Sequence, residues 1–343
     1  MINNHPTVSV VIPSYNMGWS IVRAIRSCQK QTHPAHEIVV VDDGSTDETR
    51  QIVTAEASKD SRIRYVAPPF NVGCAAAMSM GISKATGDWI AFLDADDELT
   101  PNSIADRISV LKERTGEQPG LIYGHVYVNR VSDESLVKFR ELDGYCYPYL
   151  CKELSLCAQI VMMVRRNCFS AAGFPSSEFP SSTDDDMVLT VAKHFPIACV
   201  HKPVAIIHSH DSPTRMTNNP LRVAGGVAML VSKYRKDVVR HHGRRYLALW
   251  WLRIARAYLL AEIQRLTEKR RSAIGSPHRG ASHLLSGLLN VRLRYFVSVR
   301  LAILGRIYGV LDGFLRRHFD YIYFSLLLLC DGPEFAGSLR GMA

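Results

Sequence analysis

The sequence lacks the marks of secreted and membrane-spanning proteins. Its first residues do not follow the charged, apolar and small-residue order of a secretory leader, and the apolar segment at 8–12 is too short for one. Arginines interrupt the apolar stretch at 284–311, and the uncharged run at 321–330 is about half the roughly 20 residues that a spanning helix needs. We therefore expect a cytoplasmic protein without a transmembrane helix.

Cysteine pairs of the kind that bind zinc are also missing. The eight cysteines show no Cys-x-x-Cys spacing, which argues against a disulfide framework and against a cysteine zinc site. Internal repeats and low-complexity tracts are not evident either. Reduced thiols in a globular protein of one or two domains are the simplest interpretation.

The charge is unevenly distributed along the chain. Residues 221–343 hold 21 basic and 7 acidic side chains, a net charge of +14, whereas residues 1–220 hold 20 and 25. A basic segment favours anionic partners such as membrane surfaces or phosphorylated substrates. We predict two parts, an acidic domain at 1–220 and a basic, amphipathic helical extension at 221–343.

The first part alternates between two hydrophobic periodicities. Helical spacing of apolar residues occurs between short apolar runs, and Ser45 or Thr46 could cap the helix after the second run. This order predicts an α/β fold with a central, mostly parallel sheet. The predicted strands lie at 7–12, 37–41, 62–67, 89–93 and 121–129, and the predicted helices at 18–31, 74–85 and 101–114.

Acidic residues follow two of the predicted strands. Asp42 and Asp43 end the second strand, and Asp94, Asp96 and Asp97 follow the strand that begins at Trp89. The carboxyl ends of parallel strands share one edge of the sheet, where open α/β sheets bind ligands. Converging carboxylates suit a hard divalent cation, Mg²⁺ or Mn²⁺. The alternative is an ordinary polar turn with a helix cap.

Four motifs in order resemble the family-two glycosyltransferases, which use nucleotide-activated sugars and have the A-type, Rossmann-like fold. The motifs are Val-Val-Ile-Pro-Ser-Tyr-Asn at 10–16, Val-Asp-Asp-Gly-Ser-Thr-Asp at 41–47, Asn-Val-Gly at 71–73 and Asp-Ala-Asp-Asp at 94–97. The resemblance covers about residues 7–215. It implies sugar transfer from a nucleoside diphosphate sugar to a sugar or lipid-linked acceptor, and we expect the donor to be a UDP-sugar.

The resemblance also implies roles for single residues. Pro13 and Tyr15 would line the nucleobase pocket, and Asp43, with Asp42 beside it, would bind the nucleotide. Asp94 would face the ribose. The residues implied to hold the cation are Asp96 and Asp97, with His210 as a further candidate for the metal or the diphosphate.

An inverting transfer needs a base for the acceptor hydroxyl, and the family places it in an acidic pair at a helix start. Asp184 fits this register best, and Asp185 is the second choice. Thr183 stands where the family has Glu, which is a departure from the pattern. Capping of the following helix, predicted at 187–195, would need one acid, whereas three precede it.

Three functions remain open for the basic extension, which the resemblance does not cover. It could oligomerise or pack on the catalytic domain, lie on an anionic membrane surface, or bind another acidic partner. Nucleic acid is not expected, because no recognition module accompanies the charge. We expect a metal-dependent enzyme of cell-surface polysaccharide or glycolipid assembly, peripheral on the inner face of the membrane. The alternative is a catalytically silent nucleotide-binding or scaffolding module of the same fold.

Overall fold

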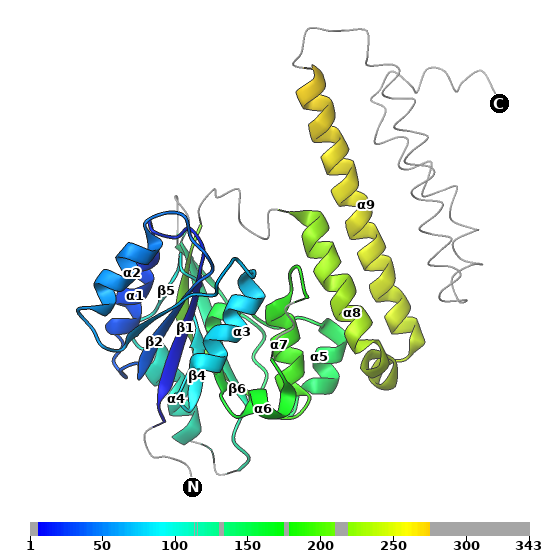
Figure 1. Cartoon of the computed structure of the whole chain (residues 1–343). Coiled ribbons are helices and arrows are strands. Elements are labelled where there is room, and N and C mark those ends of the chain that lie inside the picture. The colour runs from blue at the N-terminus through cyan, green and yellow to red at the C-terminus, as the bar shows by residue number, and fades with distance from the viewer. Residues whose placement is uncertain are drawn as a thin grey trace, which may run out of the picture. The chain divides into compact units, whose positions relative to one another are not determined.

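The computed structural model describes residues 6–274, apart from 113, 115, 130–133, 175–177 and 210–218. Its core is one nine-stranded sheet (Figure 1). Across the sheet the strands are β3 (Ile63–Val66), β2 (Glu37–Asp42), β1 (Val8–Ser14), β4 (Trp89–Phe92), β8 (Met162–Arg165), β6 (Leu121–Asn129), β9 (Ile197–His208) and β5 (Glu98–Leu99), and β7 (Glu134–Val137) pairs with β6.

Most strands run in one direction, as the sequence predicted. β3, β2, β1 and β4 are mutually parallel, and β6 and β9 form another parallel pair. β8 joins the two groups by antiparallel pairing with both β4 and β6. β6 and β9 therefore run in the same direction as β4, and their carboxyl ends share its edge of the sheet.

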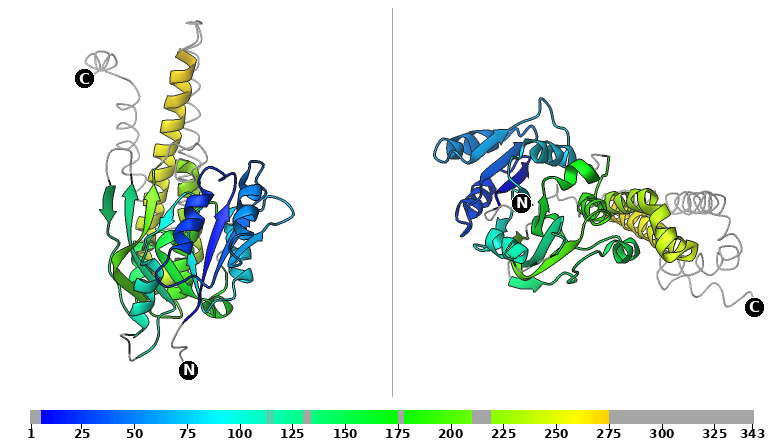
Figure 2. Two further views of the ribbon diagram at one scale, coloured as in Figure 1. Left: turned by 90° about the vertical axis from the view of Figure 1, so that its left-hand side faces the viewer. Right: turned by 90° about the horizontal axis from the view of Figure 1, so that it is seen from below.

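Helices cover both faces of this sheet (Figures 1 and 2). β1, β2 and β4 are buried along nearly their whole length, which explains their continuous apolar sequences. The helices are α1 (Ile21–Gln29), α2 (Thr49–Ala57), α3 (Cys74–Lys84), α4 (Ser103–Lys112), α5 (Tyr147–Glu153), α6 (Cys168–Ala172), α7 (Thr183–Ala192), α8 (Pro220–His242) and α9 (Arg244–Ile274), with a 3-10 turn at Gln159–Val161 before β8.

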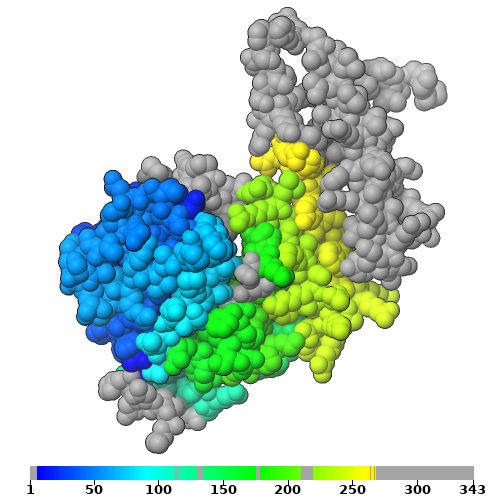
Figure 3. All heavy atoms as spheres, in the orientation of Figure 1, coloured from blue at the N-terminus to red at the C-terminus, as the bar shows by residue number. Residues whose placement is uncertain are grey.

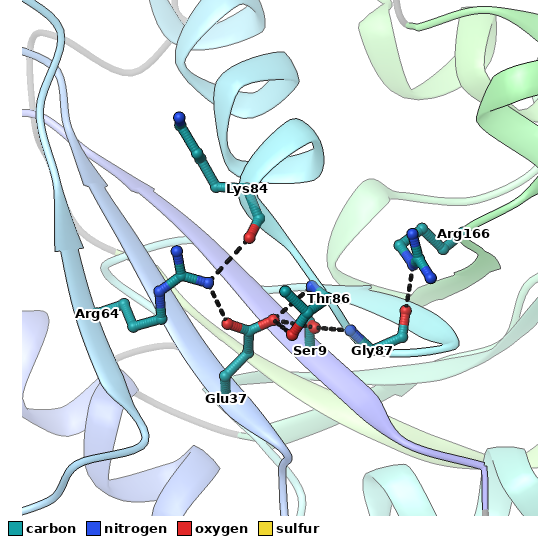
Figure 4. A network of polar contacts seen from close by, with 7 residues as sticks. All are labelled: Ser9, Glu37, Arg64, Lys84, Thr86, Gly87 and Arg166. Atoms are coloured by element: carbon teal, nitrogen blue, oxygen red, sulfur yellow. Dashed lines mark hydrogen bonds and ion pairs between the residues drawn. The ribbon is translucent and has the colours of Figure 1, made fainter.

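A buried carboxylate holds the amino edge of the sheet together (Figure 4). Glu37 accepts hydrogen bonds from Ser9, Thr86 and Arg64, all within 2.7 Å. Burial opposes its ionisation, but these bonds outweigh it and lower the pKa of Glu37 to about 2. Arg166 donates to the Gly87 carbonyl at 2.7 Å in the same network. The network fixes the residues that lead into β4.

Helix α8 and the first part of α9 belong to the same compact unit as the sheet, Met1–Ala261. Trp250, Trp251 and Tyr258 pack against the core, and the Trp250 indole donates to the Lys152 carbonyl at 3.0 Å. The division at residue 220 stays a prediction. Among the described residues, none of the helices combines the length and the apolar composition required to cross a membrane.

Candidate active site

The two predicted acidic strand ends lie on neighbouring strands. β1 lies between β2 and β4, and Ser14 at its end pairs with Asp42 at the end of β2. The Asp43 N–H donates to the Ser14 carbonyl at 2.8 Å, which continues the pairing past the strand. The residues that follow β1, β2 and β4 are therefore gathered at one edge.

Asp43 organises the loop that leads into α3. Its two carboxylate oxygens accept the backbone N–H groups of Val72 and Gly73 at 2.7 and 2.8 Å. The Asn71 amide donates to the Asp43 carbonyl at 2.9 Å. Gly73 has a φ of +87°, which a residue with a side chain rarely adopts. The predicted contact of Asp43 with a nucleobase stays a prediction.

Asp42 is engaged within the protein. One carboxylate oxygen accepts the Ser45 N–H at 3.0 Å, and the other accepts the Tyr65 hydroxyl at 2.8 Å. Burial and the Asp42 charge raise the pKa of Tyr65 to about 12. Asp42 thus fastens the turn after β2 to β3, and any nucleotide contact would come in addition.

The loop after Pro13 presents Tyr15, whose side chain is exposed. Asn16 has a left-handed φ of 55°, and its side chain accepts the Thr46 N–H at 2.8 Å. The prediction that Ser45 or Thr46 caps α2 is wrong. Asp47 accepts the Thr49 N–H at the helix start instead, at 3.0 Å, while the Ser45 hydroxyl accepts from the Asn16 N–H.

Carboxylate oxygens of Asp94, Asp96 and Asp97 lie within 4.8 Å of one another, the one such group among the described residues. Asp97 is buried and accepts the His208 N–H of β9 at 2.8 Å. Arg23 of α1 donates to the Asp96 carbonyl. Such close carboxylates repel one another, and a hard divalent cation would relieve this. The residues fit Mg²⁺ or Mn²⁺.

β9 ends at His208, two residues before the predicted His210. The His208 ring lies 2.8 Å from a Glu98 carboxylate oxygen, so it is engaged beside the acidic turn. His210 lies outside the described residues, and its role at the metal or the diphosphate stays a prediction.

The second acidic group begins α7. The helix starts at Thr183 and ends at Ala192, so its predicted span of 187–195 is displaced. α7 precedes β9, which runs parallel to β6. β9 starts at the amino edge of the sheet, so α7, which leads into it, runs from the carboxyl edge toward the amino edge. The first turn of α7 therefore faces the carboxyl edge, where the other acids lie.

The three acids in this turn divide into two kinds. Asp186 is fully buried and accepts from Lys233 at 2.6 Å and from the Tyr234 hydroxyl at 2.9 Å, both on α8. We call these three residues the Asp186 anchor. The sequence did not indicate it. Asp184 and Asp185, the predicted base candidates, are not part of it.

Asp184 and Asp185 are partly buried next to each other. Loss of hydration raises the pKa of Asp184. Loss of hydration and then the Asp184 charge raise the pKa of Asp185 to about 8, against hydrogen bonds from Ser155 and Ser182 that lower it. A carboxylate with a raised pKa is a stronger base than one in water, as a proton-accepting residue requires.

We expect Asp185→Asn to raise the melting temperature, most at pH 8. The folded carboxyl has a pKa of about 8, against about 3.9 in an unfolded chain. The folded wild type therefore binds this proton more tightly and loses stability as the pH rises from about 4 to 8. Asn removes the titration, so the gain, at least about 3 °C at pH 8, should shrink toward pH 4. Thermal unfolding without added metal measures this, and a gain independent of pH would contradict it.

Known proteins resemble the chain in sequence and in fold. Residues 9–154 match the family model described as Glycosyl transferase family 2. The putative teichuronic acid biosynthesis glycosyltransferase TuaG of Bacillus subtilis is 37% identical over 115 residues, 34% of this chain and 46% of the relative. The glycosyltransferase GlyG of Streptococcus pneumoniae is 34% identical over 143 residues, 42% of this chain and 43% of the relative. The amylovoran biosynthesis glycosyltransferase AmsB of Erwinia amylovora is 33% identical over 138 residues, 39% of this chain and 45% of the relative. The chain thus spans less than half the length of these relatives.

Two solved structures share the fold at low identity. S. aureus TarS 1–349 in complex with UDP-GlcNAc aligns with a TM-score of 0.54 and 18% identity, over 71% of each chain. The mannosyltransferase PcManGT of Pyrobaculum calidifontis, in complex with GDP-Man and Mn²⁺, aligns with a TM-score of 0.53 and 18% identity, over 89% of this chain and 88% of the other. The expected A-type fold with helices at the C-terminal side is confirmed. The part of the chain that matches the glycosyl transferase family 2 model, residues 9–154, includes β4 and the acidic turn after it.

Proposed function

We propose that this protein transfers a sugar from a nucleoside diphosphate sugar to an acceptor hydroxyl, with inversion and with a divalent cation. One observation carries the proposal. Three converging carboxylates follow β4, and the direction of the connection from α7 into β9 turns the carboxyl pair of raised pKa on α7 toward the same edge of the sheet. The first group suits a cation, and the second suits a proton acceptor.

The two groups act on opposite ends of the reaction. A cation held by Asp96 and Asp97 would stabilise the negative charge that the leaving diphosphate gains. Asp184 accepts the proton of the acceptor hydroxyl as that oxygen forms its bond to the sugar. The buried Asp97, fixed by the His208 N–H, keeps the acidic turn in place. Tyr15 and Asp43 stand at the nucleoside side of this arrangement.

The relatives support the donor class and the setting. TarS and the Pyrobaculum enzyme were solved with UDP-GlcNAc and GDP-Man, which are both nucleoside diphosphate sugars. TuaG and AmsB are named for teichuronic acid and amylovoran biosynthesis. We propose a UDP-sugar as donor and a sugar or lipid-linked acceptor in cell-surface polysaccharide or glycolipid assembly.

A panel of nucleotide sugars, each with and without Mn²⁺, tests the function. We expect one UDP-sugar to raise the melting temperature in a Mn²⁺-dependent way, because a ligand that binds the folded state stabilises it. Release of UDP from that donor should stop when the metal is chelated. Activity that survives chelation would disprove the metal role, and donor binding without any turnover would favour the silent binding module.

The basic extension is proposed to hold the enzyme at an anionic membrane on the inner face of the cell. Leu249 and Leu260 of α9 are exposed, and Arg253 lies over the Trp250 ring at 5.1 Å. Basic residues beside exposed apolar ones suit a lipid interface. Co-sedimentation with anionic vesicles at low salt tests this, and the absence of binding would favour self-association instead.

A further inference from the structure

The start of α8 is fixed against the segment that leads into α7. Asn219 caps the helix by accepting the Arg222 N–H at 3.1 Å. The Arg222 side chain donates through Nε to the Pro180 carbonyl at 2.6 Å, and the Ser181 hydroxyl donates to the Arg222 carbonyl at 3.2 Å. The main chain of Arg222 and the Nε atom of its guanidinium are therefore held in place.

This position lies at the edge of the sheet that carries the acids. Pro180 and Ser181 directly precede the turn with Asp184 and Asp185. Loss of hydration, then the charges of Asp94 and Asp43, raise the pKa of the Cys74 thiol at the start of α3 to about 12, and Arg222 opposes the rise. The charges of Asp94, Asp43 and Arg222 therefore all act on the Cys74 thiol. In Figure 3 the light-blue to cyan region that includes α3 lies beside the green to yellow region that includes α7 and α8.

Arg222 differs from the other cations that border this edge. Arg23 is bound to the Asp96 carbonyl and to Glu98, and Lys233 is bound to Asp186. Arg222 is exposed, and the hydrogen bond of its side chain to a described residue uses Nε. Its two terminal nitrogens have no hydrogen-bond partner among the described residues. They remain available to an anion.

We propose that Arg222 binds the diphosphate of the donor and stabilises it as it leaves. The inference rests on the proposed function and adds a residue that the family match, which ends at residue 154, does not contain. A guanidinium offers two parallel N–H groups to a phosphate, and its fixed Nε means that little conformational entropy is lost on binding. A donor diphosphate entering among so many carboxylates needs fixed positive charge in addition to a cation.

Binding of UDP and of uridine to the full-length chain, in Mn²⁺, tests the role of Arg222. Arg222→Gln should weaken UDP binding and lower kcat/KM for the donor by about 10- to 100-fold, the range for a charge-assisted hydrogen bond. Uridine, which has no phosphate, should bind equally well to both forms. Arg222→Lys should have a UDP affinity between those of wild type and Arg222→Gln, because lysine keeps the positive charge but lacks the two parallel N–H groups of the guanidinium. The control is Arg235→Gln, an exposed arginine of the same helix that donates to the Ser232 carbonyl, and it should match wild type.

The outcomes separate this inference from the function on which it rests. If wild type binds UDP and Arg222→Gln binds it equally well, the inference is wrong and the function stands. If UDP and uridine weaken together, Arg222 only supports the fold of the pocket, and the inference is also wrong. If wild type binds neither UDP nor any nucleotide sugar, both fail.

Discussion

Asp184→Asn is expected to lower the transfer rate by about 10²- to 10⁴-fold, the usual contribution of a general base. Asn is close to Asp in size and cannot accept the proton, so the acceptor hydroxyl loses its base. The side chain lies on α7, whereas the proposed nucleotide contacts follow β1, β2 and β4. UDP affinity should therefore change by less than about twofold. Transfer assays and calorimetry with UDP measure the two effects.

Asp185→Asn is the matched control for the base. It removes the neighbouring carboxyl of the same turn, whose pKa is raised to about 8 by loss of hydration and by the Asp184 charge. We expect it to keep most of the transfer activity and to leave the acidic limb of the pH–rate profile nearly unchanged, because the Asp185 carboxyl is uncharged below about pH 8 and therefore does not repel Asp184 there. Full activity in Asp184→Asn together with a large loss in Asp185→Asn would move the base to Asp185.

Gly226→Ala is expected to destabilise the protein by about 1–3 kcal/mol, as overpacking of a tight contact does. A Cβ at Gly226 would lie 2.0 Å from the Ser181 hydroxyl oxygen and 2.6 Å from the Ser181 carbonyl oxygen. α8 would have to move away from the segment that precedes α7. That movement would disturb the Asp186 anchor, so transfer activity should fall as well. Urea unfolding and kcat measure the two losses.

The neighbouring glycine provides a sharp comparison. A Cβ at Gly225 would meet the Tyr258 hydroxyl at 3.4 Å and Pro180 at 3.7 Å, which are ordinary contacts. Gly225→Ala should therefore show the gain of about 0.5–1 kcal/mol that Ala has over Gly inside a helix. Equal effects of the two substitutions would mean that α8 does not approach Ser181 as closely as described.

The sequence predicted the elements whose signal is local. β1, β2 and β4 are buried runs flanked by turn residues, and the acids after β4 are consecutive enough to be recognised together. A strand was also predicted at 159–164, where β8 lies, but neither its antiparallel direction nor the existence of β5 was predicted. Each of these strands is short and pairs in the antiparallel direction with a strand far away in the chain. The sequence of a short strand does not indicate which distant strand it will pair with.

The same reason explains what was missed in the site. Asp186 had the appearance of one more capping acid, because its partners Lys233 and Tyr234 stand on a helix that follows the last strand. The bond of Asp42 to the Tyr65 hydroxyl was not predicted either, because it joins two strands. Periodicity predicts which residues are buried. It does not predict which buried polar groups meet.

The bond between Asp97 and the His208 N–H has a consequence for how the protein is made. The two residues are separated by 111 positions, and β5 has no partner in the sheet until β9 is present. A ribosome adds about 5–20 residues per second, so Asp97 is synthesised roughly 5–20 seconds before the backbone N–H that it accepts. A nascent chain cut soon after residue 154 would hold the whole family match and still lack the bond that fixes Asp97 in the proposed cation site. Such pairings between distant segments also slow folding, which makes this interval the stage at which the chain most depends on protection from aggregation.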